Sequence, residues 1–206
     1  MKKDIITTEY EVSDSFSGIS VNLATADLSI AVTDGEAAMV RYDSAMQVTI
    51  SSSVQDHTLS VTLAAGDKWY KRIFLRAPRV EIMLPKAAYE ALSVKIKTGR
   101  VSICGISAKA IDASAATGEI SVSDIFFDSN VKLSLKTGSI CTSNIRCRNL
   151  DANTTTGVIT LDGVLIAKNL KLKTTAGTIN LRGSDASTSS ITASAGFING
   201  NLLSYE

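Results

Sequence analysis

The sequence is poor in aromatic residues and proline, and it carries almost no net charge. Aromatic residues make up 5% of the 206 positions and proline occurs twice, although 45% of the residues are hydrophobic. A core must therefore be built from Val, Ile, Leu and Ala in many thin, similar layers. The formal charge of +1 argues against a general attraction to nucleic acid or membranes. The hydrophobic share argues against disorder.

Residues that commonly build metal sites, disulfides and catalytic centres are also scarce. Cys104, Cys141 and Cys147 are odd in number and lack a C-x-x-C spacing, which disfavours a disulfide framework or a zinc site. His57 is the only histidine, and nothing in the sequence marks a nucleophile or an orienting carboxylate for it. Phosphate-binding loops, G-x-S-x-G and the calcium-binding nonapeptide of other β-rolls are absent. We therefore expect no enzyme activity, no cofactor and no metal.

The sequence shows no targeting or membrane-spanning segment. The start, MKKDIITTEYEVS, has two lysines but no apolar stretch after them, so it does not read as a signal peptide. No run approaches the roughly 18 apolar residues of a membrane helix, and we expect no membrane insertion. The compartment stays open. A complete chain would be cytoplasmic, whereas a chain trimmed of a leader or anchor would belong to the cell surface or the exterior.

The C-terminal half contains a repeat of 19–20 residues. Six glycines, each preceded by Thr or Ala, are separated by 19, 20, 19, 20 and 19 residues. They are Gly99, Gly118, Gly138, Gly157, Gly177 and Gly196. A branched aliphatic residue follows each glycine by two positions, and an alternating apolar pattern precedes it, as in strands with one buried face. Each repeat therefore predicts a strand, a Thr-Gly or Ala-Gly corner, a second strand, a second corner and a return segment.

One such repeat cannot bury its inner face, but stacked repeats can, with strands about 4.8 Å apart. We therefore predict an all-β fold, a single-stranded parallel β-solenoid whose regular coils span residues 91–206. Inner residues alternate in size between coils, as where Leu133 falls between Ala113 and Ala152. A large side chain beside a small one keeps the packing density constant. Because this alternation repeats every two coils, the solenoid is interpreted as a duplication of two-coil units.

The first 90 residues keep only part of the pattern. Residues 19–30 reproduce one coil, with Ala26 in the place of the glycine. Segments 38–44, 46–53, 58–66 and 79–85 alternate like strands, and turns are predicted at 34–35 and 55–57. We predict that residues 1–90 form longer, hairpin-bearing coils that cap one end of the same continuous domain. A short helix is predicted over residues 86–92, after Pro85.

Outward-facing positions of stacked strands should form columns. One column reads Ser93, Asp112, Lys132, Asp151, Lys171 and Ser190. Its alternating charges predict a ladder of ion pairs that fixes the register of the coils, each pair contributing at most about 1 kcal/mol. Arg100 with Glu119, and Asp162 with Arg182, are predicted to form two further pairs on the next strand.

Four lysines on the first face are less balanced by acids. They are Lys95, Lys97, Lys136 and Lys173. Thr155, Thr174 and Thr175 would add hydroxyl groups nearby. We interpret this patch as a candidate site for an anionic glycan or a teichoic-type polymer. The alternative is an ordinary solvated face.

The order of the segments resembles that of a bacterial family. FSGISVNLATADLSI precedes VEIMLPKAAYEALSVKIKTGRVSI, and repeated T-G-x-I coils follow. The V-x-I-x-L-P motif at 80–85, leading into L-x-V-x-I-x-T-G, is the most specific feature. Nearly the whole chain is similar to a family of putative adhesins with a β-strand-repeat domain of unknown function. The resemblance implies a β-solenoid and an adhesin-like role, and it offers no catalytic residues to transfer.

Three functional hypotheses follow. The first is a non-enzymatic, adhesin-like binding or interaction module for an anionic glycan or another protein, and not for nucleic acid. The second is a self-assembling scaffold, a homo-oligomer in which solenoids stack through one end. The third, a polysaccharide-active β-helix enzyme, would need clustered acids, whereas Lys132 separates Asp112 from Asp151 in their column.

Overall fold

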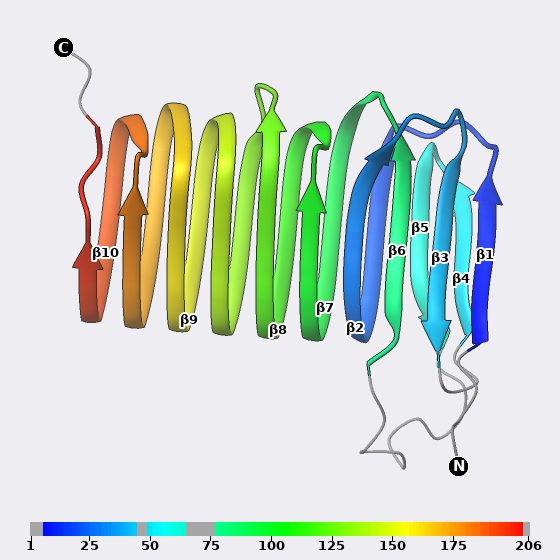
Figure 1. The fold of residues 1–206 in the computed structure, drawn as a ribbon, viewed down its shortest axis with the longest axis horizontal. Coiled ribbons are helices and arrows are strands. Elements are labelled where there is room, and N and C mark those ends of the chain that lie inside the picture. The colour runs from blue at the N-terminus through cyan, green and yellow to red at the C-terminus, as the bar shows by residue number, and fades with distance from the viewer. Residues whose placement is uncertain (1–5, 45–48, 65–76, 204–206) are drawn as a thin grey trace.

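The computed structural model describes residues 6–44, 49–64 and 77–203. Every element in these ranges is a β-strand, and the strands join in one 10-stranded sheet that winds along the long axis of the molecule (Figure 1). The strands are β1 (Ile6–Val12), β2 (Gly18–Thr33), β3 (Ala38–Ser44), β4 (Thr49–Gln55), β5 (Thr58–Ala64), β6 (Arg79–Pro85), β7 (Ala88–Cys104), β8 (Ser107–Phe126), β9 (Asn130–Arg182) and β10 (Asp185–Asn199).

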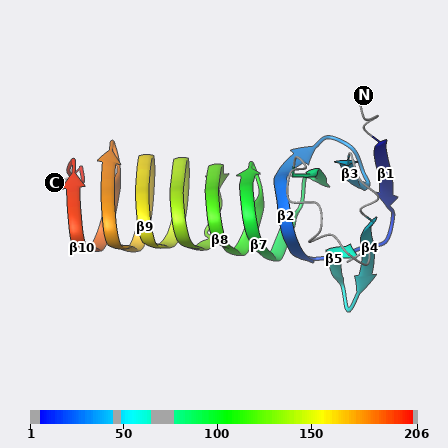
Figure 2. The same ribbon diagram turned by 90° about the horizontal axis from the view of Figure 1, so that it is seen from below.

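The regular part is a stack of parallel coils. β7 pairs with β8, β8 with β9 and β9 with β10, always in parallel and nearly always 19 or 20 residues apart. Each long strand bends around the corners of its coil, and β9 continues through successive coils (Figures 1 and 2). The predicted all-β, parallel solenoid fold is therefore confirmed.

Alternate side chains fill the interior of the stack. The aliphatic residues two positions after the repeat glycines, such as Ile120, Ile140 and Ile159, are fully buried. Leu133 lies against Ala113 in the neighbouring coil, and both are fully buried. Buried residues from Ile19 to Leu181 form one continuous hydrophobic cluster. The thin aliphatic layers expected from the composition therefore join into one core.

The repeat glycines lie one on top of the other at the first corner. The pairs of glycines are in register, for example Gly99 with Gly118 and Gly118 with Gly138. A Cβ atom at any of the six repeat positions would lie 1.7–2.0 Å from a backbone carbonyl oxygen of the preceding coil. Five of the six also have φ between 133° and 152°. Glycine is required here because the carbonyl oxygen of the neighbouring coil occupies the space of a side chain.

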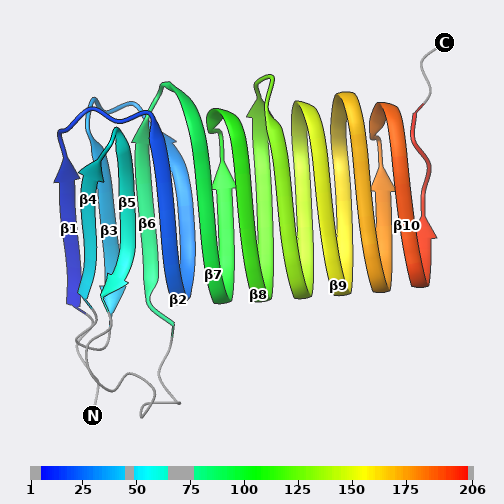
Figure 3. The same cartoon turned by 180° about the vertical axis from the view of Figure 1, so that it is seen from behind.

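The N-terminal end is capped by strands that do not stack in sequence order. β2 pairs in parallel with β7 on one side, where Ala26 lies opposite Gly99. On its other side β2 pairs with β5 and, from Asp27 onward, with β6. The chain therefore places β2 inside the stack, between β7 on one side and β5 and β6 on the other (Figure 3).

Antiparallel pairs complete this cap. β4 and β5 form a hairpin, with a turn at Asp56 and His57, both at positive φ. β3 pairs antiparallel with β1 and with β6. The prediction of a hairpin-bearing region at one end is confirmed, and β3 and β6 have the predicted bounds. Parts of the predicted strands at 46–53 and 58–66 lie outside the described residues.

The predicted helix over residues 86–92 is wrong, because β7 begins at Ala88. The Tyr89 hydroxyl donates a hydrogen bond to the Pro85 carbonyl over 2.8 Å, and the Tyr89 ring stacks on Phe16 at 5.9 Å. Tyr89 and Leu92 are both buried as the strand enters the coil. Tertiary burial of these side chains overrides the local helix propensity of the segment.

Candidate functional site

The strand that leads to each repeat glycine presents every second residue to the outside. These outward residues align between coils: Ser93, Asp112 and Lys132 are paired neighbours, and so are Lys95, Ser114 and Ser134. We call this surface the lysine face. It consists of the outward residues of segments 91–97, 110–116, 130–136, 149–155 and 169–175.

The lysine face is more positive than the rest of the molecule. It carries six exposed lysines, Lys95, Lys97, Lys132, Lys136, Lys171 and Lys173. Two partly buried acids, Asp112 and Asp151, lie among them. Six lysines minus two aspartates give the face a charge of +4, whereas the whole chain has +1. The remaining surface must therefore carry −3, and the face stands out electrostatically.

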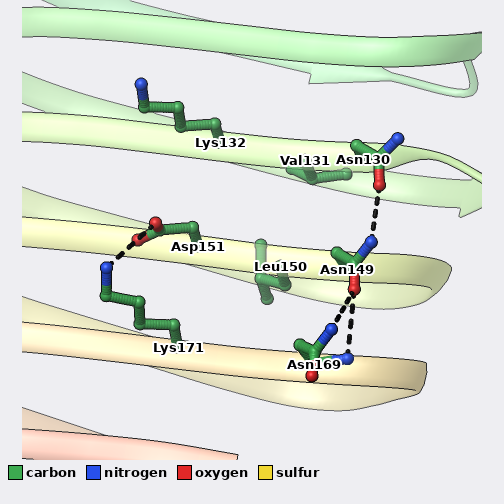
Figure 4. A pocket seen from close by; sticks show the side chains of 8 residues that line it. All are labelled: Asn130, Val131, Lys132, Asn149, Leu150, Asp151, Asn169 and Lys171. Carbon is green, nitrogen blue, oxygen red and sulfur yellow. Dashed lines mark hydrogen bonds and ion pairs between the residues drawn. The ribbon is translucent and has the colours of Figure 1, made fainter.

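Most of these lysines have no acidic partner among the described residues. Lys171 Nζ lies 3.6 Å from Asp151 Oδ2, and none of the other five forms an ion pair with a described residue. Lys132 points away from Asp151 (Figure 4). The predicted charge ladder is therefore wrong in part: the column has the predicted order, but only one of its steps is an ion pair.

Of the two ion pairs predicted on the next strand, one is present and the other is not found among the described residues. Arg100 Nε lies 3.0 Å from Glu119 Oε2, as predicted. Asp162 and Arg182 form no ion pair in the described part of the chain. An exposed ion pair contributes little to stability. Stacking of the coils therefore does not by itself hold the side chains of Asp162 and Arg182 together.

An asparagine ladder borders the lysine face. Asn149 Nδ2 donates to Asn130 Oδ1 over 2.6 Å, and Asn169 donates to Asn149 Oδ1 from its Nδ2 at 2.9 Å and from its backbone N–H at 3.2 Å (Figure 4). Sequence reasoning missed this ladder. Its signal was the recurrence of asparagine after 19 and 20 residues, one position before an inward leucine or valine.

Two adjoining hollows of about 310 Å³ each lie on the lysine face, and the first is bordered by the asparagine ladder. The first is lined by Asn130, Val131, Lys132, Asn149, Leu150, Asp151, Asn169 and Lys171. The second is lined by Asp151, Asn153, Thr154, Thr155, Lys171, Lys173 and Thr175. They share Asp151 and Lys171, so together they form a trough with amide, hydroxyl, carboxylate and ammonium groups. This trough offers hydrogen-bond donors and acceptors but no aromatic platform.

The structure places the four lysines of the sequence-predicted patch on this face, but not all at the trough. Lys173 lines the second hollow. Lys95, Lys97 and Lys136 lie on coils nearer the N-terminal cap, where they are exposed.

The prediction that Thr174 adds a hydroxyl group to the patch is wrong. Thr174 is fully buried, and its Oγ1 has no hydrogen-bond partner among the described residues. The inward register of the strand puts this side chain in the core. Thr155 and Thr175 do line the trough.

The described residues contain no group of three or more His, Cys, Asp or Glu side chains that could hold a metal ion. All three cysteines are free. Burial raises the pKa of the Cys147 thiol to about 12, with a smaller contribution from Asp128. A thiol with this pKa stays protonated at neutral pH and is a poor nucleophile. Within the same residues, no helix has the length and hydrophobicity needed to cross a bilayer.

Stacked coils with a thin core and a polar outer face define the class of this protein, a β-solenoid. The family model described as Toastrack DUF4097 matches residues 16–202, and the chain belongs to that family. None of the curated proteins matches the chain.

Solved structures of three bacterial proteins are similar to this chain to different degrees. A putative adhesin from Bacteroides fragilis has a TM-score of 0.59 at 17% identity, with 96% of this chain and 97% of that chain covered. A putative cell adhesion protein from Clostridium sporogenes has a TM-score of 0.49 at 12% identity, with 95% and 98% covered. A putative adhesin from Parabacteroides distasonis has a TM-score of 0.49 at 11% identity, with 97% and 98% covered. At such identities the Bacteroides likeness concerns the fold alone.

Proposed function

We propose that this protein is a non-enzymatic binding module that holds an anionic glycan on its lysine face. The observation that carries the proposal is the charge of +4 on that face, with five of its six lysines unpaired among the described residues. Unpaired lysines attract an anionic ligand without first having to break an ion pair. Their long side chains can also adapt to a flexible polymer.

The trough supplies the second half of the argument. Sugars present many hydroxyl groups, and they are bound by side chains that donate and accept hydrogen bonds at once. Thr155 and Thr175 offer such groups beside Lys171 and Lys173. Asn153, whose Nδ2 donates to Ser134 Oγ over 3.0 Å, adds its amide oxygen as an acceptor. The interior, by contrast, is filled by aliphatic side chains that are fully buried. A ligand is therefore expected on the outer face and not inside the solenoid.

The test compares the wild-type chain with a variant in which Lys95, Lys97, Lys136 and Lys173 are all changed to Gln. A glycan array and pull-downs with acidic polysaccharides should show binding by the wild type that weakens as salt rises. The quadruple variant should lose this binding. Its thermal unfolding should be unchanged, because all four side chains are exposed.

A matched control removes four exposed cations outside the lysine face. They are Arg41, Arg79, Arg146 and Arg182, again changed to Gln. This variant should bind like the wild type. Equal losses of polysaccharide binding in both variants would show that net charge alone, and not the lysine face, is responsible. Failure of the wild type to bind any acidic polysaccharide would refute the proposal.

A second candidate function is self-association along β10. Phe197 and Ile198 of this strand are 74% and 47% exposed, and residues 186–205 contain no charged side chain. Edge strands that stay unpaired usually carry charges or proline. Sedimentation velocity over a dilution series should then show a concentration-dependent dimer that Ile198→Lys converts to monomer. A wild-type chain that is monomeric at every concentration would exclude this candidate.

A further inference from the structure

The lysines of the lysine face are confined to alternate coils. The coils that lead to Gly99, Gly138 and Gly177 carry two lysines each, and we call them the lysine coils. The coils that lead to Gly118 and Gly157 carry none, and each has one aspartate instead, so we call them the aspartate coils. Successive repeat glycines lie in direct contact, which fixes this alternation in space as well as in sequence.

The alternation sets a distance. Neighbouring strands of a sheet are about 4.8 Å apart, so neighbouring lysine coils are separated by roughly 9.6 Å along the solenoid axis. This spacing is close to the length of an extended disaccharide. Each lysine coil offers two lysines along its strand, and each column along the axis also holds two: Lys132 with Lys171, Lys95 with Lys173, and Lys97 with Lys136. Lysine side chains are long and flexible enough to reach a ligand from a neighbouring column. A ligand along the axis therefore meets the lysines of all three lysine coils, whereas a ligand along a strand meets those of one.

We propose that the lysine face binds a linear acidic polysaccharide that lies along the solenoid axis and carries one carboxylate per disaccharide. This inference rests on the proposed function and specifies its ligand. Each carboxylate would lie over a lysine coil, and the neutral sugar between two carboxylates would lie over an aspartate coil.

The aspartate coils suit a neutral sugar. In the coil of Gly157, Asp151 is already paired with Lys171 over 3.6 Å, and the outward neighbours Asn153 and Thr155 are uncharged. Amide and hydroxyl groups are suitable partners for sugar hydroxyls. In the coil of Gly118, Asp112 has no ion pair with a described residue.

The same aspartates should disfavour polymers with a carboxylate on every sugar. Such a polymer would bring every second carboxylate over an aspartate coil, close to Asp112 or Asp151. Like charges at short range are repulsive, and building in such repulsion is a common way to reject a competing ligand. The face should therefore select by the spacing of charge and not only by its amount.

The experiment uses the full chain and isothermal titration calorimetry at low salt. The probes are hyaluronan hexasaccharide, which has one carboxylate per disaccharide, and trigalacturonate, which has the same number of carboxylates but one on every sugar. Hyaluronan hexasaccharide should bind about tenfold more tightly, the ratio that a ~1.4 kcal/mol difference produces. Neutral dextran should not bind.

A single substitution tests the role of the aspartate coils. Asp112→Lys should raise the affinity for trigalacturonate more than the affinity for hyaluronan hexasaccharide. The ratio of the two affinities should therefore become smaller. Asp162→Lys adds the same charge outside the lysine face and should leave the preference unchanged. Circular dichroism and thermal unfolding verify that both variants are folded.

The outcomes separate this inference from the function on which it rests. Equal or tighter binding of trigalacturonate by the wild type, lost in the quadruple lysine variant, would refute the selection by spacing but leave glycan binding intact. No binding of either oligosaccharide or of any acidic polysaccharide would refute both. Tighter binding to anionic phospholipid vesicles than to hyaluronan would also refute the inference, because it would assign the face to a membrane surface.

Discussion

The contact between repeat glycines gives the sharpest prediction about stability. In Gly138→Ala the new Cβ would lie 1.9 Å from the carbonyl oxygen of Gly118, whereas real Cβ atoms essentially never approach closer than 3.0 Å. The coil must therefore move by more than 1 Å or twist at the corner. A residue at φ 133° adds strain of about 1–3 kcal/mol. Loss of about two ladder hydrogen bonds adds roughly 1 kcal/mol each. We expect a total loss of about 3–5 kcal/mol.

Gly163→Ala is the matched control. Gly163 also has positive φ, at 61°, and belongs to β9, but the nearest atom to its Cβ position is 4.0 Å away. Only the backbone term remains, about 1–2 kcal/mol. Urea unfolding followed by circular dichroism compares the two midpoints at constant slope. If Gly138→Ala lowers the free energy of unfolding no more than Gly163→Ala does, the carbonyl contact does not limit this corner.

Three further predictions concern the core. Ile140→Ala removes a fully buried side chain and should cost about 2–5 kcal/mol in urea unfolding; a change below the error of the method would refute the inward register. Thr174→Val removes a buried hydroxyl without a partner and should raise the free energy of unfolding by roughly 1 kcal/mol, whereas Thr154→Val, whose hydroxyl donates to a carbonyl at 3.4 Å, should not. Cys147 is buried and has a raised pKa, so it should react with a thiol reagent more slowly than the half-buried Cys104 until urea unfolds the chain; equal rates would contradict its placement.

The regular coils could be predicted because each carries the same local signals. A glycine, a branched aliphatic residue two positions later and an alternating strand before it recur in register, and stacking is the only way to bury such a face repeatedly. The order of the N-terminal cap could not be predicted in this way. The coil at residues 19–30 was predicted, and Ala26 does take the place of a repeat glycine opposite Gly99. The direct pairing of this coil with β7, a segment far away in the sequence, was not predicted. No local sequence pattern indicates that β2 pairs with β7 on one side while the strands of the cap lie on its opposite side.

The candidate face could be predicted only in part. Which residues face outward follows from the period of two, so the lysine columns were visible in the sequence. The direction in which a long side chain points on a solvated surface was not, and Lys132 turns away from Asp151. Thr174 was misplaced because threonine suits both sides of a strand. Its place in the alternation, and not its polarity, decides that it is buried.

The place of β2 within the stack has a consequence for synthesis on the ribosome. Neighbouring regular coils can close as soon as 19–20 further residues have emerged, whereas Asp27 meets Arg100 only 73 residues later. Closing the longer loop costs about 1 kcal/mol more in chain entropy. Until residue 104 has left the exit tunnel, β2 of the nascent chain cannot complete its pairing with β7. The end that is made first is therefore completed late, and a chaperone that protects exposed strands would be needed at the N-terminal cap before anywhere else.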